Sequence, residues 1–258
     1  MKIAALQFSV DKSISNNFET IKQSIIEASH NDTRLLITQE CALCGYPPIE
    51  INSLNDIDFI EQDKAIEQII ELSKEHNIYI ALGLIRREND LFKNSIMLIS
   101  PDGTESYYDK RALWGWDIDN YTPGTDKNGI WVIDGVKIGI RICFEIRFPE
   151  YFRELYKENV ELAIVSFCDI NEKPNIGRLN IIKSHLLTRA IENAFTIVSV
   201  NGTTLNQTAP TCVIDPDGMV LSEAPQNKQY ILYYDYIKSE DGFGRKGRIH
   251  YNNKLTTV

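Results

Sequence analysis

The sequence lacks a long hydrophobic run. None of its apolar stretches approaches the roughly 20 residues that a transmembrane helix needs, so we expect no contact with a membrane. The opening segment, MKIAALQFSV, is apolar over only a few residues and has no small-residue cleavage site. It therefore predicts a first strand and not a signal peptide.

Positive charge is also scarce. The 258 residues include 27 Lys and Arg against 36 Asp and Glu, which gives a formal net charge of −9. A nucleic-acid-binding surface needs clustered basic side chains, so we expect no nucleic-acid partner. The hydrophobic fraction of 43% and the charged fraction of 24% are typical of a globular protein with a full core.

A cysteine pattern typical of disulfide-bonded proteins is missing as well. The five cysteines are an odd number, and without a secretion signal they predict free thiols in a reducing compartment, the cytoplasm. Cys41 and Cys44 form one C-x-x-C pair, but no second Cys or His pair accompanies them to complete a zinc site. We therefore expect plain loop or core thiols there, no bound metal and no cofactor.

Helical and strand-like patterns alternate along the first part of the chain. Hydrophobic periodicity predicts helices over about 17–30, 61–76, from near Pro149, and 178–194. Strand-like runs cover 2–8, 34–38, 78–85, 94–100, 105–109, 131–143, 160–167, 195–201, 209–215, 219–223 and 230–236. The run 131–143 is expected to be a hairpin that turns at Asp134-Gly135.

One short sequence occurs twice. The stretches LISPDGT (98–104) and VIDPDGM (213–219) each lead from a strand through a Pro-Asp-Gly turn into another strand. Either this turn is simply common, or two similar hairpins mark the halves of a pseudo-symmetric layered protein. Alternating helices and strands, interrupted by strand–strand connections, predict an α/β sandwich with helices on the sheet faces better than a closed βα barrel.

No linker or low-complexity segment divides the chain. We therefore expect residues 1–258 to form a single domain. Several glycines and many polar residues lie near the end of the sequence. They predict that residues 243–258 are an irregular tail at an interface between subunits of an oligomer.

Three predicted strands end in a polar residue. Glu40 comes after the run LLIT, Lys110 follows SYYD, and Cys143 ends KIGIRIC. In α/β proteins, side chains at the carboxyl ends of strands face the crevice where ligands bind. Taken one at a time, each residue has an ordinary structural explanation. Glu40 fits a solvated strand end, and Lys110 fits a side chain that extends along its aromatic neighbours to water. Cys143 fits a core thiol.

Together the three residues supply the parts of a nucleophilic site. A cysteine nucleophile needs a base that takes its proton and a positive group where negative charge develops. Glu40 supplies the base, Lys110 the cation and Cys143 the nucleophile, and a helix that follows closely would help to activate the thiol. A Cys–His hydrolase is an alternative, although none of the four histidines follows a predicted strand as Glu40 does.

At these positions the sequence resembles the nitrilase, or carbon–nitrogen hydrolase, family. LLITQECALCGYPP is similar to the family's Glu motif, YYDKRAL to its Lys motif and RICFEIRFPE to its Cys motif. LLTRAIENAFTIVSVN (186–201) resembles a fourth stretch, and the similarity extends from Met1 to about Tyr236. The resemblance implies a four-layer αββα sandwich with two mixed sheets and outer helices, a homodimer or larger homo-oligomer, and a catalytic triad of the three residues above.

The resemblance also indicates how the substrate pocket is built. The family often has a second glutamate in the loop after its lysine, and Asp117 stands there with the same charge and one methylene fewer. Phe144 replaces a common Tyr or Trp beside the nucleophile, and Glu145 replaces a frequent Asp. The residues predicted to bind substrate are Tyr46, Asp117, Phe144 and Phe167, with Trp114 and Trp116 as further candidates for the pocket wall.

Two pairs of charged residues are expected to have structural roles. Arg189 and Glu192 lie three residues apart on a predicted helix and should form an ion pair that docks it. Arg147 and Glu150 follow the cysteine, and we expect them to form ion pairs near the start of the next helix.

The implied activity is hydrolysis of a carbon–nitrogen bond other than a peptide bond. Glu40 would take the proton of Cys143, whose thiolate attacks a small linear amide, forms a thioester and releases ammonia or an amine. Lys110 and the backbone N–H of Phe144 would stabilise the oxyanion, and water would then release a carboxylic acid. An ω-amide, an N-carbamoyl amine and an aliphatic amide are all open as substrates. A nitrile substrate, or a catalytically silent binding or regulatory protein, are the alternatives.

Overall fold

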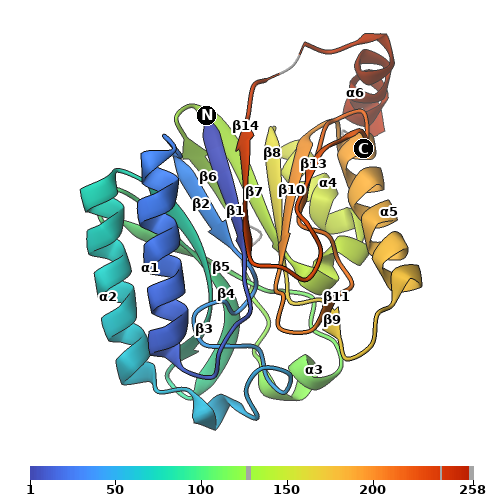
Figure 1. Cartoon of the computed structure of the whole chain (residues 1–258). Coiled ribbons are helices and arrows are strands. Elements are labelled where there is room, and N and C mark those ends of the chain that lie inside the picture. Colours follow the sequence, from blue (N-terminus) through green and yellow to red (C-terminus); the bar gives the residue numbers. More distant parts are fainter. Residues whose placement is uncertain (126–128, 239, 256–258) are drawn as a thin grey trace.

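Two six-stranded sheets form the centre of the molecule (Figure 1). The computed structural model describes residues 1–125, 129–238 and 240–255. The first sheet has the order β14-β1-β2-β3-β4-β5. Its strands are β1 (Lys2–Gln7), β2 (Leu35–Thr38), β3 (Tyr79–Glu88), β4 (Leu91–Ile99), β5 (Glu105–Asp109) and β14 (Tyr230–Asp235).

The second sheet has the order β13-β12-β10-β8-β7-β6. Its strands are β6 (Ile130–Ile133), β7 (Val136–Ile142), β8 (Leu162–Phe167), β10 (Thr196–Asn201), β12 (Cys212–Ile214) and β13 (Val220–Glu223). A short pair outside both sheets joins β9 (Ile170–Asn171) to β11 (Asn206–Gln207). The predicted hairpin at Asp134-Gly135 is confirmed as the β6–β7 connection.

The two sheets share one topology. In the first, β1, β2 and β3 run parallel, and β14, β4 and β5 pair antiparallel at the edges. In the second, β7, β8 and β10 run parallel, and β6, β12 and β13 take the matching edge positions. The two Pro-Asp-Gly turns connect β4 to β5 and β12 to β13, which are equivalent hairpins. Of the two interpretations left open for the repeated sequence, the pseudo-symmetric one therefore agrees with the sheet topology.

Helices cover the outer face of each sheet (Figure 1). α1 (Ile14–His30) and α2 (Phe59–His76) pack on the first sheet, and α4 (Pro149–Lys157) and α5 (Ile176–Asn193) on the second. Shorter elements are α3 (Trp116–Asn120) and the 3-10 helices η1 (Leu54–Asp56) and η2 (Cys143–Arg147). This is the predicted αββα sandwich with two mixed sheets, and that prediction is confirmed.

Three apolar layers hold the sandwich together. The middle layer lies between the sheets and includes Ile3 of β1 and Ile164 of β8. The outer layers lie under the helices, where Leu6 faces α1 and α2, and Phe152 and Leu186 join α4 and α5 to the second sheet. Because the central strands are buried on both faces, their sequences are continuous apolar runs. Such runs can be recognised in the sequence, and the strands were predicted from them.

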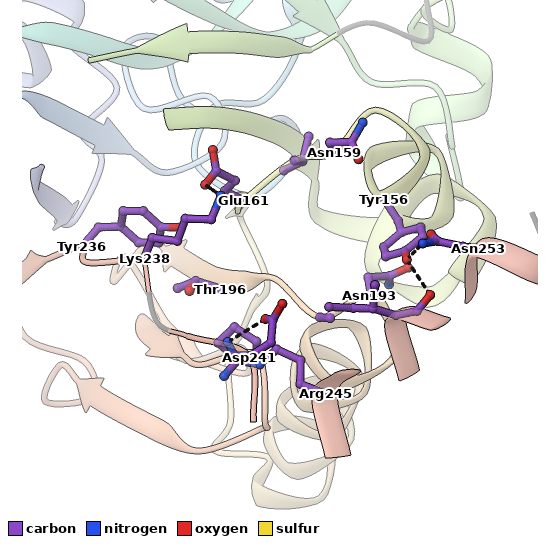
Figure 2. A pocket seen from close by; sticks show the side chains of 14 residues that line it. Tyr156, Asn159, Glu161, Asn193, Thr196, Tyr236, Lys238, Asp241, Arg245 and Asn253 are labelled. Atoms are coloured by element: carbon purple, nitrogen blue, oxygen red, sulfur yellow. Dashed lines mark hydrogen bonds and ion pairs between the residues drawn. The ribbon is translucent and has the colours of Figure 1, made fainter. Parts of the chain in front are cut away.

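The end of the chain differs from the prediction of an irregular tail. Phe243–Leu255 form helix α6, which packs beside α5. The Tyr156 hydroxyl donates to Ile249 O at 3.2 Å and contacts Asn253 Oδ1 at 2.7 Å. These residues line a hollow of about 240 Å³. Figure 2 shows the side chains of Tyr156 and Asn253 beside one another there. Two glycines lower the helix propensity of this segment. Its contacts with the rest of the fold stabilise the helix in spite of them. Residues 256–258 lie outside the described residues.

None of the helices in the described ranges combines the length and the hydrophobicity that a bilayer crossing requires.

Candidate active site

The loops that follow β2, β5, β7 and β8 meet around one cavity of about 360 Å³. Among its lining residues are Tyr46, Lys110, Asp117, Cys143 and Phe144, all of them predicted site residues. Glu40 lies beneath this cavity, bonded to two residues that line it, Lys110 and Cys168. The structure therefore brings together Glu40, Lys110 and Cys143, which are spread over about 100 residues of the chain.

Glu40 is held by three donors. Its Oε1 accepts from Asn94 Nδ2 at 2.7 Å and from Lys110 Nζ at 2.8 Å, and its Oε2 accepts from the backbone N–H of Cys168 at 2.8 Å. All three partners donate, so the group is presented as a carboxylate acceptor. Oε2 has only one of these donors and keeps room for a further proton donor, such as a thiol.

Lys110 lies between two buried carboxylates. Its Nζ is 2.8 Å from Glu40 Oε1 and 2.7 Å from Asp117 Oδ2, and the side chain is only 2% exposed. Burial by itself lowers the pKa of Lys110, but the negative charges of the Glu40 and Asp117 carboxylates outweigh it, so the pKa is raised. An ammonium has three N–H donors, and two of them point at carboxylates. One donor remains for a ligand.

Asp117 reaches the lysine in spite of its short side chain. It lies in the first turn of α3, where it is buried, and its Oδ1 accepts from the Tyr46 hydroxyl at 2.5 Å. Burial, followed by the charges of Glu40 and Asp117, raises the pKa of Tyr46. The hydroxyl therefore stays protonated and serves as a donor that fixes Asp117 beside Lys110.

Cys143 is the one cysteine that is partly exposed. The other four cysteines are buried, and all five lie within the described residues. It has a left-handed backbone with φ of 46° and starts the 3-10 helix η2 directly after β7. Burial of the sulfur and the negative charge of Glu40 raise the pKa of the Cys143 thiol, although Lys110 opposes this. The resting sulfur is thus a thiol, which needs a base at the moment of attack.

The aromatic residues of the predicted pocket divide into two groups. Phe144 lines the cavity and stacks on Trp114, with ring centroids 6.1 Å apart. Phe167 is not among the described residues that line this cavity. Alternation along β8 turns Phe167, like Ala163 and Val165, toward the helices of the second sheet. Its carbonyl instead accepts from the backbone N–H of Glu40 at 3.3 Å.

Trp116 is also absent from the cavity lining. It packs edge-to-face on Tyr121, with ring centroids 5.6 Å apart, and belongs to the layer under α1 and α2.

Glu145 connects the segment around Lys110 to the segment around Cys143 by hydrogen bonds. Its Oε1 accepts from the Tyr108 hydroxyl and from the backbone N–H of Arg111, both at 2.8 Å. Its Oε2 accepts from the backbone N–H of Ile142 at 2.7 Å. The fully buried carboxylate therefore joins the strand that precedes Lys110 to the strand that precedes Cys143, across the two sheets.

Three polar residues that the sequence analysis did not single out belong to the site. Asn94 on β4 donates to Glu40, and a buried Asn within an apolar strand was the signal for it. Asp169 and Arg178 line the far side of the cavity, where Arg178 Nε and Nη2 each donate to Asp169 at 2.7 Å. Both lie in or beside the loop 168–178 after β8, and nothing local distinguishes them from ordinary surface charges.

The predicted docking pair is confirmed. Arg189 Nη1 is 2.9 Å from Glu192 Oε1, and the same guanidinium donates to the carbonyls of Ile146 and Arg147, which fixes α5 against η2. The ion pairs expected of Arg147 and Glu150 are not found among the described residues. The guanidinium of Arg147 instead lies over the ring of Phe144, 5.8 Å from its centroid.

The other candidate chemistries have less support. Cys41 and Cys44 are both buried in the layer under α1 and α2. Within the described ranges no group of three or more His, Cys, Asp and Glu side chains is placed to hold a metal ion. The cavity lining contains no histidine among its described members. In the hollow of Figure 2, the carboxylates of Glu161 and Asp241 are already paired with Lys238 and Arg245.

A family comparison agrees with this arrangement. Residues 2–238 match the family model described as carbon-nitrogen hydrolase. The chain belongs to the carbon–nitrogen hydrolase family. The resemblance found in the sequence motifs is thereby confirmed.

Relatives of this carbon–nitrogen hydrolase include characterised amidases. A 2-oxoglutaramate amidase of Bacillus subtilis (strain 168) is 29% identical over 231 residues, which cover 86% of this chain and 85% of that protein. A deaminated glutathione amidase of Dictyostelium discoideum is 25% identical over 243 residues, which cover 85% of this chain and 82% of the relative.

Solved structures share the fold of this carbon–nitrogen hydrolase. A mutant amidase from Nesterenkonia sp. AN1 in complex with butyramide matches with a TM-score of 0.81 at 20% identity, covering 92% of this chain and 90% of that one. A second mutant of that amidase shows covalent addition of the acetamide moiety of fluoroacetamide at its active-site cysteine. It matches with a TM-score of 0.83 at 18% identity, over 100% of this chain and 97% of that one.

Proposed function

We propose that this carbon–nitrogen hydrolase is an amidase that cleaves small linear amides through a thioester on Cys143. The observation that carries the proposal is the position of Lys110. Its ammonium is shared between Glu40 and Asp117 at a cavity that also contains the one cysteine that is not buried. Cation and nucleophile therefore face the same space, with the base beneath it and bonded to the cation. The amidases among the relatives support this assignment.

Acylation starts at the thiol. Glu40 takes the proton of Cys143, and the sulfur forms a bond to the amide carbonyl carbon. Negative charge develops on the carbonyl oxygen, where the third N–H of Lys110 and the backbone N–H of Phe144 donate to it. Phe144 is the second residue of η2, at which a helix has backbone N–H groups without intrahelical partners. Glu40 returns the proton to the leaving nitrogen, and ammonia or an amine departs.

Deacylation uses the same groups. A water molecule gives its proton to Glu40 and attacks the thioester carbonyl, and the oxyanion forms again beside Lys110 and Phe144. The carbon–sulfur bond then breaks, the sulfur recovers its proton from Glu40, and a carboxylic acid leaves. One carboxylate thus acts as base, acid and base again.

The first test is ammonia release from a panel of ω-amides, N-carbamoyl amines and aliphatic amides. We expect Cys143→Ala to remove release completely, and Cys212→Ala, at a buried thiol of β12, to keep it. Lys110→Ala is a poorer test, because it leaves two buried carboxylates without their cation at a cost of about 3–5 kcal/mol in folding. Ammonia release that survives in Cys143→Ala would contradict the proposal.

The alternatives have their own outcomes in the same panel. A nitrilase would release ammonia from small nitriles and not from amides. A silent binding protein would release none, and its Cys143 would react with iodoacetamide no faster than the four buried thiols.

We also propose that residues 1–258 form a single catalytic domain that assembles into a homodimer in a reducing compartment, the cytoplasm. Exposed apolar side chains on helix α6 support a subunit contact there, with Phe243 98% exposed and Tyr251 64% exposed. The five free cysteines support a reducing compartment. Light scattering after gel filtration measures the mass in solution, and a monomer at micromolar concentration would contradict the dimer.

A further inference from the structure

The far side of the cavity carries a second cation, Arg178, which lies in the first turn of α5. Asp169 receives its Nε and its Nη2, each at 2.7 Å. No described residue accepts from Nη1, and the side chain is 45% exposed. One edge of the guanidinium is therefore fixed by protein, and the edge formed by Nη1 and Nη2 is left for a ligand.

Asp169 is itself held in place. Its backbone N–H donates to Asn201 Oδ1 at 2.9 Å, and its carbonyl accepts from Asn201 Nδ2 and from the backbone N–H of Thr208, both at 2.8 Å. The Thr208 hydroxyl donates to its Oδ1. With both carboxylate oxygens occupied and only 5% of the side chain exposed, Asp169 orients Arg178 and has little capacity to bind a cationic ligand itself.

The charges of the cavity assign different tasks to its two cations. Lys110 and Arg178 are the cations among the described lining residues. Lys110 is engaged by two carboxylates and has one donor for the oxyanion, so it cannot also hold a negatively charged end of a substrate. Arg178 can do so, because a guanidinium edge matches the two oxygens of a carboxylate. Asn175 caps α5 beside it, and the positive end of the helix dipole favours an anion.

We propose that Arg178, positioned by Asp169, binds a carboxylate at the far end of the substrate, so that the preferred amides are linear and anionic. This inference rests on the proposed amidase function and narrows it. Ile49, Phe144 and Ile170 line the cavity and are placed to contact the methylenes between the two ends. The same carboxylate occurs in ω-amides of dicarboxylic acids and in N-carbamoyl amino acids, whereas simple aliphatic amides lack it.

The test compares substrates of one shape. Glutaramate, its neutral methyl-ketone isostere and N-carbamoyl-β-alanine differ in the charge of the far end or in the group that joins it to the amide. We expect the wild type to prefer the two anionic compounds over the neutral one, and the ratio of the two anionic ones identifies the source of the carboxylate. Equal kcat/KM values for glutaramate and its neutral isostere would overturn the inference.

Variants locate the effect. Because a hydrogen bond to a charged group contributes about 1.5–3 kcal/mol, we expect Arg178→Gln to lower kcat/KM for glutaramate by roughly 10- to 100-fold, mainly through KM. The kcat/KM for the neutral isostere should change by less than about twofold, because this compound has no charged group to bind Arg178. Arg178→Lys keeps the charge without the fork and should recover part of the loss. Lys183→Gln, which removes a cation from the same helix where it pairs with Glu223, is the control.

A binding measurement separates this inference from the amidase proposal. Calorimetry with glutarate uses the Cys143→Ala protein with and without Arg178→Gln, and it needs no turnover. Binding that depends on Arg178 supports the carboxylate site even if no amide is hydrolysed, in which case the amidase proposal alone fails. Equal loss of activity on charged and neutral amides in Arg178→Gln, or glutarate binding that ignores the substitution, would overturn the site.

Discussion

At the scale of single residues, the site is a balance of buried charges. One ammonium, that of Lys110, lies between the carboxylates of Glu40 and Asp117. Neither carboxylate could be buried at this depth without it, because an unpaired buried charge is strongly unfavourable. Asp117, at the position where the resemblance implies a glutamate, still reaches the lysine because α3 brings its Oδ2 to 2.7 Å from Lys110 Nζ. Tyr46 then supplies the hydrogen bond that fixes it.

A third buried carboxylate, Glu50, is not part of the site but supports it. Its Oε2 accepts from the backbone N–H of Tyr46 at 2.9 Å, and its Oε1 accepts from the Thr204 hydroxyl at 2.5 Å. Burial raises the pKa of Glu50 from 4.5 to about 7, in spite of these two donors. Its protonated form is therefore favoured by folding.

This shift makes stability depend on pH. A carboxyl whose pKa is raised by folding stabilises the protein fully below its unfolded value and loses that contribution as the pH rises through the folded value. The side chain in Glu50→Gln stays neutral at every pH. We therefore expect the free energy of unfolding of this variant, relative to the wild type, to increase as the pH rises from 5 to 8, by up to about 3 kcal/mol. Calorimetric melting temperatures at the two pH values measure it.

Glu67→Gln, at an exposed position on α2, is the control for this pH experiment. The difference between Glu67→Gln and the wild type should be the same at both pH values. A melting-temperature difference for Glu50→Gln that stays constant with pH, or falls as the pH rises, would show that Glu50 does not titrate in this range.

At the scale of elements, the site depends on how strands end. β2 stops at Thr38, and the chain then turns so closely against β3 that a Cβ at Gly83 would lie 2.0 Å from Gln39 O. Gly83 N donates to Thr38 Oγ1 at 2.9 Å, and Gly83 O accepts from Leu43 N at 3.0 Å. A glycine in the neighbouring strand is therefore required for the turn that presents Glu40.

We expect Gly83→Ala to affect both folding and catalysis. The added methyl group meets backbone and not a flexible side chain, so overpacking should cost about 1–3 kcal/mol. The turn must shift, and displacement of Glu40 should lower kcat by more than tenfold, since catalysis is sensitive to misplacement on the order of 1 Å. Urea unfolding and steady-state kinetics measure the two effects.

The matched control is Gly247→Ala on α6, where no atom lies within 4 Å of the added Cβ. It should leave kcat unchanged and stabilise the helix slightly, because alanine has the higher helix propensity. Wild-type kcat in Gly83→Ala would mean that the turn after β2 does not hold Glu40 in its working position.

At the scale of the whole molecule, two sheets of one topology place the motifs on facing loops. Glu40 and Lys110 come from the first sheet, Cys143 and Asp169 from the second, and Glu145 links the two sheets behind them. The repeated hairpins lie at equivalent edges but have different partners. Asp102 of the first accepts from Thr104, whereas Asp217 of the second accepts from Arg245 at 2.7 Å and from Arg248 at 2.5 Å.

This difference predicts how α6 is anchored. We expect Asp217→Asn to release α6 part of the time and to speed tryptic cleavage within it by roughly fivefold, since two ion pairs to a carboxylate at the surface contribute about 1 kcal/mol together. The equivalent change in the first sheet, Asp102→Asn, is the control and should leave the cleavage rate unaltered. Limited proteolysis followed by mass spectrometry measures the rate and the site.

The same variant bears on assembly. If α6 takes part in the proposed subunit contact, Asp217→Asn should also weaken the dimer in light scattering. Unchanged cleavage of Asp217→Asn would show that its pairs with Arg245 and Arg248 do not anchor the helix.

The sequence by itself determined the layers and the candidate catalytic residues. Strands buried on both faces read as apolar runs, and an abrupt Glu, Lys or Cys at the end of such a run is a local signal. Hence periodicity predicted an α/β sandwich, the strand ends singled out Glu40, Lys110 and Cys143, and the family resemblance implied the four layers and the catalytic roles that remain proposals. The repeated Pro-Asp-Gly turn left pseudo-symmetry as one of two interpretations, and only the matching topology of the two sheets decided between them.

Tertiary structure decided everything that depends on partners distant in sequence. Which face of β8 carries Phe167 depends on how the sheet packs, and the helix at the end of the chain depends on contacts with α4, α5 and Asp217. The tasks of Glu145, Asp169 and Arg178 depend on which groups the fold places beside them. Local patterns report what a residue is and how the backbone repeats, whereas the energy of a buried charge is set by its neighbours in space.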